Sequence, residues 1–189
     1  LILDFTFEYN QSIELEKRAS TDELTLLFNR RRINEVIKEQ YEIFQRYQKT
    51  SSYIMLDIDY FKNINDLFGH QTGDEVLCEI ANIIKSKIRS VDYAGRWGGE
   101  EFMIICPNTS LENAFQLAEK LRLSFMGMKN STGAAVTASF GVGEIAQGES
   151  TDKLLKRIDD ALYQAKENGR NQIIFAKSAP ASEFMTHFQ

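Results

Sequence analysis

The sequence has few cysteines and prolines, and it has no long apolar run. Two cysteines and two prolines occur among its 189 residues, too few cysteines for a disulfide-based fold. Cys78 and Cys106 lie within apolar patterns, so we expect small core residues rather than a disulfide or a metal site. No apolar stretch approaches the roughly 20 residues that cross a bilayer, and no signal-peptide pattern is visible.

An excess of positive charge is also absent. Lys and Arg number 22 and Asp and Glu number 27, which gives a net charge of −5. Neither a nucleic-acid surface nor a membrane surface is therefore expected. Hydrophobic residues make up 43% and charged residues 26%, as in an ordinary soluble domain. Reduced cysteines fit a cytoplasmic location, either of a free protein or of the cytoplasmic part of a larger, membrane-anchored one.

The length predicts one domain with short extensions. Residues 1–20 begin apolar and become charged, which suggests a helical lead-in. The chain begins at Leu1 without Met, so we expect a piece of a larger protein with an upstream sensor region. The domain itself is assigned to residues 21–176. Residues 177–189 are mixed in character, contain Pro180, and are assigned to a tail.

Hydrophobic periodicity predicts four helices and five strands in the domain. Thr72 and Glu75 have the spacing of a capping box and predict a helix start. The order is β-α-β-β-α-β with additions, which indicates an α+β fold of ferredoxin-like arrangement, with a central, mostly antiparallel sheet flanked by helices. The predicted helices are 29–47, 72–88, 111–125 and 151–167, and the predicted strands are 53–58, 93–97, 100–106, 134–142 and 172–175.

Two glycines stand between the second and third predicted strands, and two acids begin the third. Gly98 and Gly99 between two strand-like runs predict a two-residue hairpin turn, because such turns need the positive φ that Gly tolerates. An exposed glycine turn also lets a ligand approach the backbone. Glu100 and Glu101 are hard oxygen ligands suited to Mg²⁺ or Mn²⁺. Taken alone, the same residues also fit a solvated turn.

A second acidic cluster ends the first predicted strand. Asp57 and Asp59 lie two positions apart, so on a strand their side chains share a face. A carboxylate at the end of a buried strand needs a partner, and a metal ion would supply one. The alternative is that both residues begin a loop and cap the next segment.

The stretch after Asp57 resembles the GGDEF family of diguanylate cyclases. Residues 57–74 match the family pattern D-x-D-x-F-K-x-x-N-D-x-x-G-H-x-x-G-D at every fixed position. Family motifs also occur at 22–31 and 161–171, and together with the hairpin they cover about residues 20–176. Leu26 stands where the family usually has glycine, which puts the shape of the first loop in question. The resemblance implies the core of nucleotidyl cyclase catalytic domains.

The activity implied by the resemblance is condensation of two GTP molecules into cyclic di-GMP and two pyrophosphates. Phosphoryl transfer needs in-line positioning and neutralised charge, and divalent ions can provide both. The implied metal ligands are Asp57, the Ile58 carbonyl, Glu100 and Glu101, with two Mg²⁺ or Mn²⁺ ions expected per site. The implied catalytic residues are Glu100, Glu101 and Lys62.

The resemblance also implies how GTP binds. Lys166 and Arg170 would clamp the β- and γ-phosphates, although both residues also fit cations at a helix end. Asn65 and Asp74 would read guanine, although Asp74 also fits a first-turn acid. The remaining groups expected near the nucleotide are the backbones at Phe61, Lys62, Gly98 and Gly99.

Making a cyclic dinucleotide from single-site domains requires two domains, so we expect a homodimer paired through the lead-in. Arg89 and Asp92 have the family's spacing for a product-inhibition site that binds cyclic di-GMP. Their alternative is a helix-end arginine and a loop aspartate. A catalytically silent module that binds GTP or cyclic di-GMP is the competing function. A cyclase making a cyclic mononucleotide is a weaker third reading, because the motifs match the dinucleotide family throughout.

Overall fold

The computed structural model describes residues 20–128, 133 and 135–178. Its central sheet has the strand order β2-β3-β1-β4-β5. Three pairings are antiparallel, and only β4–β5 is parallel. The elements in chain order are α2 (Arg30–Tyr47), β1 (Ser51–Ile58), α3 (Phe61–Phe68), α4 (His70–Lys87), β2 (Tyr93–Arg96), β3 (Glu101–Pro107), α5 (Leu111–Met126), β4 (Ala138–Glu144), α6 (Thr151–Glu167) and β5 (Ile173–Phe175).

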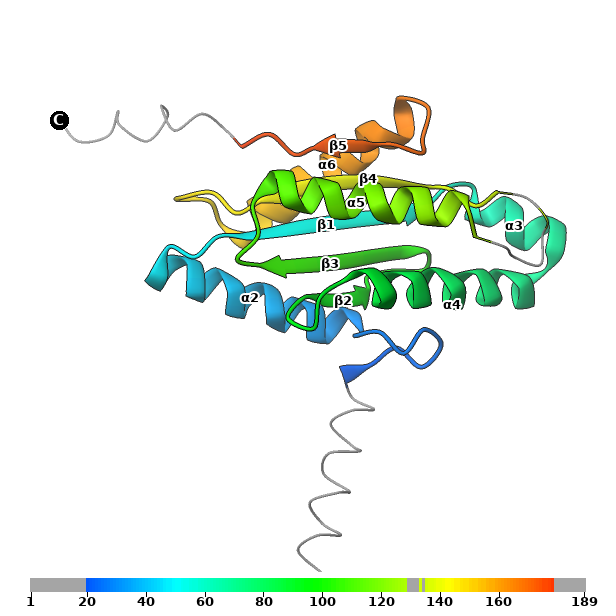
Figure 1. Ribbon diagram of the computed structural model, residues 1–189, viewed down its shortest axis with the longest axis horizontal. Coiled ribbons are helices and arrows are strands. Elements are labelled where there is room, and N and C mark those ends of the chain that lie inside the picture. The colour runs from blue at the N-terminus through cyan, green and yellow to red at the C-terminus, as the bar shows by residue number, and fades with distance from the viewer. Residues whose placement is uncertain (1–19, 129–132, 134, 179–189) are drawn as a thin grey trace, which may run out of the picture.

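This order confirms the predicted α+β fold with a mostly antiparallel sheet. Strand β1 lies at the centre between β3 and β4, and α4 and α5 cross the sheet side by side (Figure 1). A central strand covered on both sides needs apolar residues on both faces. All eight residues of β1 are accordingly buried.

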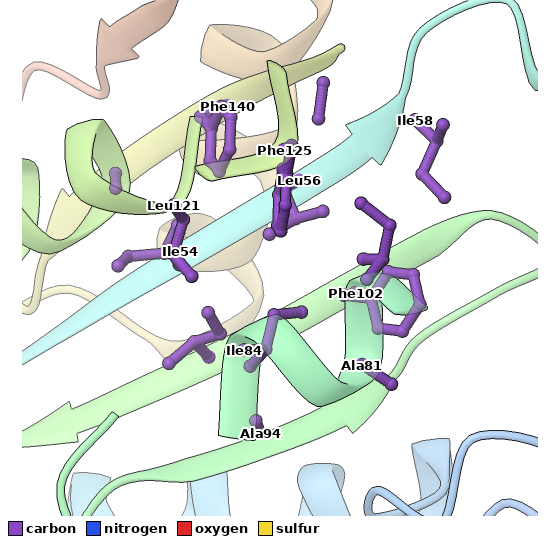
Figure 2. Packing of buried hydrophobic residues seen from close by; sticks show 14 of the residues in the cluster. Ile54, Leu56, Ile58, Ala81, Ile84, Ala94, Phe102, Leu121, Phe125 and Phe140 are labelled. Carbon is purple, nitrogen blue, oxygen red and sulfur yellow. The ribbon is translucent and has the colours of Figure 1, made fainter. Parts of the chain in front are cut away.

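Alternate residues of β1 enter two separate cores. Ile54, Leu56 and Ile58 face α4 and α5, where they pack with Phe102, Phe125 and other apolar side chains (Figure 2). Tyr53 and Met55 face α2 and α6. Because side chains alternate along a strand, Asp57 follows Tyr53 and Met55 onto the α6 face. The pleat of β1 therefore directs the first acid of the sequence cluster toward helix α6.

Helix α6 lies very close to β4. A Cβ added at Gly141 would stand 2.2 Å from the Ile158 carbonyl oxygen, and one at Gly143 would meet the Ile158 side chain at 2.7 Å. Only glycine permits this approach of a helix to a strand. The close packing fixes the end of α6 near the end of β1.

The predicted helix at 72–88 is wrong at its start. The structure has two helices there, α3 and α4, which meet at Gly69 with φ +85°. The capping box is also absent: α4 begins at His70, and the Thr72 hydroxyl donates to the Phe68 carbonyl instead. Glycine in the left-handed region turns the chain between the helices. The strand predicted at 134–142 begins only at Ala138.

The loop before α2 forms despite the missing glycine. Leu26 takes φ +55°, and its N–H donates to the Asp22 carbonyl at 2.9 Å. The Leu26 side chain is 67% exposed. The family's glycine therefore corresponds to a left-handed position, which Leu occupies here at a steric cost.

Most of the predicted lead-in and tail lies outside the described residues, as residues 1–19 and 179–189. In the part that is described, no helix is both long and apolar enough to cross a membrane. Cys106 is buried in the core, Cys78 is partly buried, and both are free thiols.

Candidate active site

Asp57 lies at the end of β1 among charged neighbours. It is opposite Glu101 in the β1–β3 ladder, so the two side chains share a face of the sheet. Its Oδ2 lies 2.7 Å from Nζ of Lys166 at the end of α6. Burial raises the pKa of Asp57 to about 6; Lys166 opposes the rise, while Glu100 and Glu101 add to it. A carboxylate held so unfavourably benefits from a further positive charge.

The hairpin loop differs from the predicted two-residue turn. The Trp97 N–H donates to the Glu101 carbonyl at 2.7 Å, which leaves residues 98–100 in the loop. Neither Gly98 nor Gly99 has positive φ. An added Cβ at Gly98 would stand 2.5 Å from Oε2 of Glu101, so a side chain there would displace the Glu101 carboxylate. The Glu101 carboxylate thus folds over Gly98, while nothing lies within 4 Å of a Cβ at Gly99.

Arg96 ties this loop to the first family motif. Its guanidinium donates to the Gly99 carbonyl at 2.8 and 3.0 Å and lies 3.4 Å from a carboxylate oxygen of Asp22. Asp22 also accepts hydrogen bonds from the N–H and hydroxyl of Thr25. The Ile58 N–H donates to the Glu100 carbonyl at 3.3 Å, so the loop also reaches the end of β1. The sequence analysis did not predict a role for Arg96. Its position two residues before the glycines is the signal that could have indicated one.

Asp59 has a different role from Asp57. It is buried and accepts hydrogen bonds from the hydroxyls of Thr137 and Ser139, both at 2.7 Å, and from the Asn171 N–H at 3.0 Å. These three donors satisfy the carboxylate. Asp59 therefore joins the turn after β1 to β4 and to the turn after α6, and it does not cap the following helix α3, which has no side-chain cap.

No ready-made cluster of three Asp, Glu, His or Cys side chains suited to a metal ion occurs in the described residues. The oxygen donors at this end of the sheet are nevertheless of the right kind. Asp57 experiences the charges of both Glu100 and Glu101, and hard carboxylate and carbonyl oxygens suit Mg²⁺ or Mn²⁺. The residues present fit a divalent ion that also binds waters and phosphate oxygens.

The two proposed guanine readers lie on neighbouring helices. Asn65 is on α3, and Asp74 follows Gly73 near the start of α4. A Cβ at Gly73 would stand 2.0 Å from Oδ1 of Asn65, so the Asn65 side chain rests directly on Gly73. Asp74 is exposed. The expectation missed the packing role of Gly73, which a glycine inside a helical pattern signals.

The remaining nucleotide-binding candidates surround the same end of the sheet. Phe61 is buried and Lys62 is exposed at the first turn of α3, where backbone N–H groups lack intrahelical partners. Arg170 lies beyond the end of α6, and its N–H donates to the Ala165 carbonyl at 3.0 Å. Its guanidinium lies over the Tyr60 ring, 4.6 Å from the centroid.

Arg89 and Asp92 form a separate site. The Arg89 guanidinium and Asp92 are ion-paired at 2.6 Å, and the Arg89 N–H donates to the same carboxylate at 2.8 Å. Arg89 also donates to the Thr109 hydroxyl at 2.7 Å. Both residues line a pocket of about 270 Å³ that also contains Lys87 and Lys120. A larger pocket of about 790 Å³, between α6 and β5, contains none of the predicted site residues. The predicted sites are therefore identified by the side chains present and not by the volume of the pocket.

Comparison with known families gives a match over most of the domain. Residues 19–172 match the GGDEF family, described as diguanylate cyclase, GGDEF domain. The diguanylate cyclase DgcM of Escherichia coli K12 is 40% identical over 176 residues, which cover 93% of this chain and 43% of that protein. The response regulator PleD of Caulobacter vibrioides is 40% identical over 171 residues, covering 87% and 37%. The chain thus spans less than half the length of these two relatives.

Solved structures agree with this match. The GGDEF domain of DgcB from Caulobacter crescentus, in complex with c-di-GMP, has a TM-score of 0.81 at 34% identity and covers 85% of this chain and 97% of that one. The active GGEEF domain of a diguanylate cyclase from Vibrio cholerae has a TM-score of 0.76 at 38% identity, covering 80% and 98%. The chain therefore belongs to the GGDEF family of diguanylate cyclase domains.

Proposed function

We propose that this domain is an active diguanylate cyclase that condenses two GTP molecules into cyclic di-GMP and two pyrophosphates. The observation that carries the proposal is the gathering of Asp57, Glu101 and Lys166 on one face of the sheet, beside the loop that holds Glu100. Adjacent carboxylates and cations are what a triphosphate and its metal ions require. Family membership and 40% identity to a diguanylate cyclase support the same activity.

The metal-binding residues in this proposal are Asp57, the Ile58 carbonyl, Glu100 and Glu101. Mg²⁺ or Mn²⁺, two per site, would neutralise charge on the phosphates and favour ionisation of the attacking 3′-hydroxyl. Lys166 compensates Asp57 by direct contact at 2.7 Å, and the same ammonium would bind phosphate oxygens of the nucleotide. Glu101, folded over Gly98, would support Glu100 at the metal.

The phosphates would be bound from three sides. The first N–H groups of α3, at Phe61 and Lys62, would cradle phosphate oxygens, and the Lys62 ammonium would stabilise developing negative charge. Lys166 and Arg170 would clamp the β- and γ-phosphates. The loop is exposed at Gly99 and half-buried at Gly98, so the backbone at Gly99 is the more accessible to the nucleotide.

Guanine would be read by Asn65 and Asp74. The Asp74 carboxylate can accept from guanine N1–H and N2–H, and the Asn65 amide can pair with O6 or N3. Adenine lacks the N1 proton, so a site built on Asp74 disfavours ATP. One such site holds one GTP, which is why catalysis requires a homodimer with two sites facing each other.

Arg89 and Asp92 would bind the product and inhibit the enzyme. The pocket around them is positive through Arg89, Lys87 and Lys120, which suits the phosphates of cyclic di-GMP. DgcB was crystallised with c-di-GMP, in support of product binding by domains of this fold. The upstream sensor region and the cytoplasmic location remain predictions from the sequence.

The decisive experiment incubates the purified chain with GTP and Mg²⁺ and identifies the products by chromatography. An active enzyme gives cyclic di-GMP and pyrophosphate, whereas a silent module binds nucleotide and leaves GTP unchanged. A cyclic mononucleotide would indicate the third alternative. Mixing the chain with a Glu100→Gln copy would also test the need for two complete sites.

We expect Glu100→Gln to abolish synthesis while the fold remains intact. Loss of a charged ligand removes metal-dependent stabilisation of the transition state on the order of several kcal/mol. Turnover is measured with Mg²⁺ at saturating GTP, and folding by circular dichroism. Glu112→Gln, a change in the first turn of α5, is the matched control and should retain activity. Near-normal turnover of Glu100→Gln would refute its role as a metal ligand.

A further inference from the structure

Tyr60 and Arg170 are far apart in the sequence, and the Arg170 guanidinium lies over the Tyr60 ring. The guanidinium carbon of Arg170 lies 4.6 Å from the centroid of the Tyr60 ring. Tyr60 is 59% exposed, so the ring is not there to fill a core. This distance is within the range of a cation–π interaction.

The backbone around both residues is unusual. Tyr60 has φ +56° and Arg170 has φ +65°, and residues with a Cβ adopt this left-handed region rarely. A hydrogen bond between their sequence neighbours joins the two turns. Asp59 precedes Tyr60 and Asn171 follows Arg170, and the Asn171 N–H donates to the Asp59 carboxylate at 3.0 Å. The bond fixes the two turns side by side and aims both side chains into the same space.

A guanidinium over an aromatic ring can still bind an anion. Arginine has five N–H donors, and attraction of the charged group to the ring is not a conventional hydrogen bond. Within the described residues, the Arg170 side chain makes this contact with the ring and no hydrogen bond or ion pair. Its donors therefore remain available to a ligand while its orientation is already restricted.

We propose that Tyr60 is a positioning residue that holds the Arg170 guanidinium over its ring and leaves the N–H donors of that group available to the triphosphate. This inference rests on the proposed function, in which Arg170 binds the phosphates of GTP. A free arginine side chain loses rotamer freedom when it binds a ligand, and prior stacking reduces that loss. Because the ring holds Arg170 in the same way before and during the reaction, the effect falls on nucleotide binding more than on turnover.

The test measures binding of a non-hydrolysable GTP analogue with Mg²⁺ by calorimetry, using the whole chain. This readout needs no product formation, so failure of the proposed synthesis and failure of this inference are separate results. Tyr60→Leu should weaken binding about two- to five-fold, the range of an exposed cation–π contact. Tyr60→Phe and Tyr60→Trp should restore the affinity, because they provide a ring face without the tyrosine hydroxyl.

Tyr47→Leu is the matched control. Tyr47 is 61% exposed and also lies near an arginine, with Arg46 at 5.9 Å from its ring, but it stands at the end of α2. Its replacement should leave nucleotide affinity unchanged. In an Arg170→Ala background, Tyr60→Leu should have no further effect, because the group that it positions is gone.

Three binding results would overturn the inference. The first is wild-type affinity in Tyr60→Leu, and the second is failure of Tyr60→Phe to restore the affinity. The third is an equal loss from Tyr60→Leu with and without Arg170. If the chain is active, the KM for GTP should rise in Tyr60→Leu while kcat stays within about twofold. A fall in kcat alone would also contradict the assigned role.

Discussion

Asp57 and Asp59 are the same type of residue and lie two positions apart, but their different contacts give them different roles. Asp59 receives three hydrogen bonds from protein groups, so its charge is satisfied within the fold. Asp57 has one close cation, Lys166, and two acidic neighbours. The sequence placed both acids at the end of a strand, and their different contacts then come from β4 and the turn after α6, which are distant in the chain.

At the scale of single residues, Gly73 decides where Asn65 lies. We expect Gly73→Ala to lower GTP affinity by about 1–3 kcal/mol, because the new Cβ displaces the Asn65 amide from its guanine partner. The fold should survive, since alanine favours a helix interior over glycine by about 1 kcal/mol. Calorimetry with GTP gives the affinity, and thermal unfolding gives the stability.

Gly127→Ala is the matched control for that change. Gly127 caps α5, and a Cβ there would meet nothing closer than 3.5 Å. The Gly127→Ala variant should bind GTP with the affinity of the unmodified chain. If Gly73→Ala also bound GTP normally, Asn65 would not be a reader of the base.

Asp74 can be tested by base preference. Asp74→Ala should weaken GTP binding by roughly 1–3 kcal/mol, since two guanine donors lose their acceptor, and should narrow the difference between GTP and ATP. Competition binding with both nucleotides measures that difference. Glu75→Ala, which removes the adjacent exposed acid, should keep the preference. Unchanged discrimination in Asp74→Ala would assign base reading to another residue.

At the scale of elements, loops were harder to predict than helices and strands. Periodicity located the α6 range without error, because an apolar stripe depends on the helix alone. The hairpin loop instead depends on Arg96 holding the Gly99 carbonyl and on Glu101 lying over Gly98. Such contacts arise from tertiary structure, so the existence of the hairpin was predictable while its turn geometry was not.

Leu26 gives a stability prediction for the first loop. Its φ of +55° is costly for a residue with a Cβ, and its 67% exposure means that little burial is lost on removal. Leu26→Gly should therefore stabilise the folded state by up to about 1 kcal/mol, after the added chain entropy of glycine is subtracted. Urea unfolding measures the change.

Leu26→Ala serves as the control, because it removes the exposed side chain and retains the Cβ. It should give no comparable gain. Greater stability in the alanine variant than in the glycine variant would show that backbone strain at this position is not the cause.

At the scale of the whole molecule, the helices and strands around the site could be predicted from the sequence, whereas the tertiary contacts between them could not. The β-α-β-β-α-β order and the end of β1 follow from local patterns and place Asp57 near the hairpin. The splitting of α3 from α4 depends on Gly69, and the stacking of Tyr60 on Arg170 depends on chain segments far apart in sequence. No local pattern contains that information.

We expect product inhibition to act through the proposed dimer. If cyclic di-GMP binds at Arg89 and Asp92, it should inhibit without direct competition with GTP, because the pocket is separate from the nucleotide site. It would hold two domains misaligned, and a small displacement is enough to stop a reaction that needs near-attack geometry. Arg89→Ala removes a phosphate-binding cation and should relieve this inhibition while synthesis at low product concentration continues.

Initial rates at increasing cyclic di-GMP give the inhibition constant. Arg46→Ala, a change in the last turn of α2, is the control and should remain as sensitive as the unmodified enzyme. Equal sensitivity of Arg89→Ala would leave Arg89 as a helix-end arginine paired with Asp92.

The buried Asp59 has a consequence for the order in which the domain becomes complete during synthesis. Its partners Thr137, Ser139 and Asn171 lie 78, 80 and 112 residues further along the chain. Contacts of such separation close large loops and form slowly, and translation supplies the chain from the N-terminus. A nascent chain that ends before Asn171 therefore has the carboxylates of β1 and the hairpin without the turn that holds Arg170. The proposed phosphate site is completed only when almost the whole domain has left the ribosome.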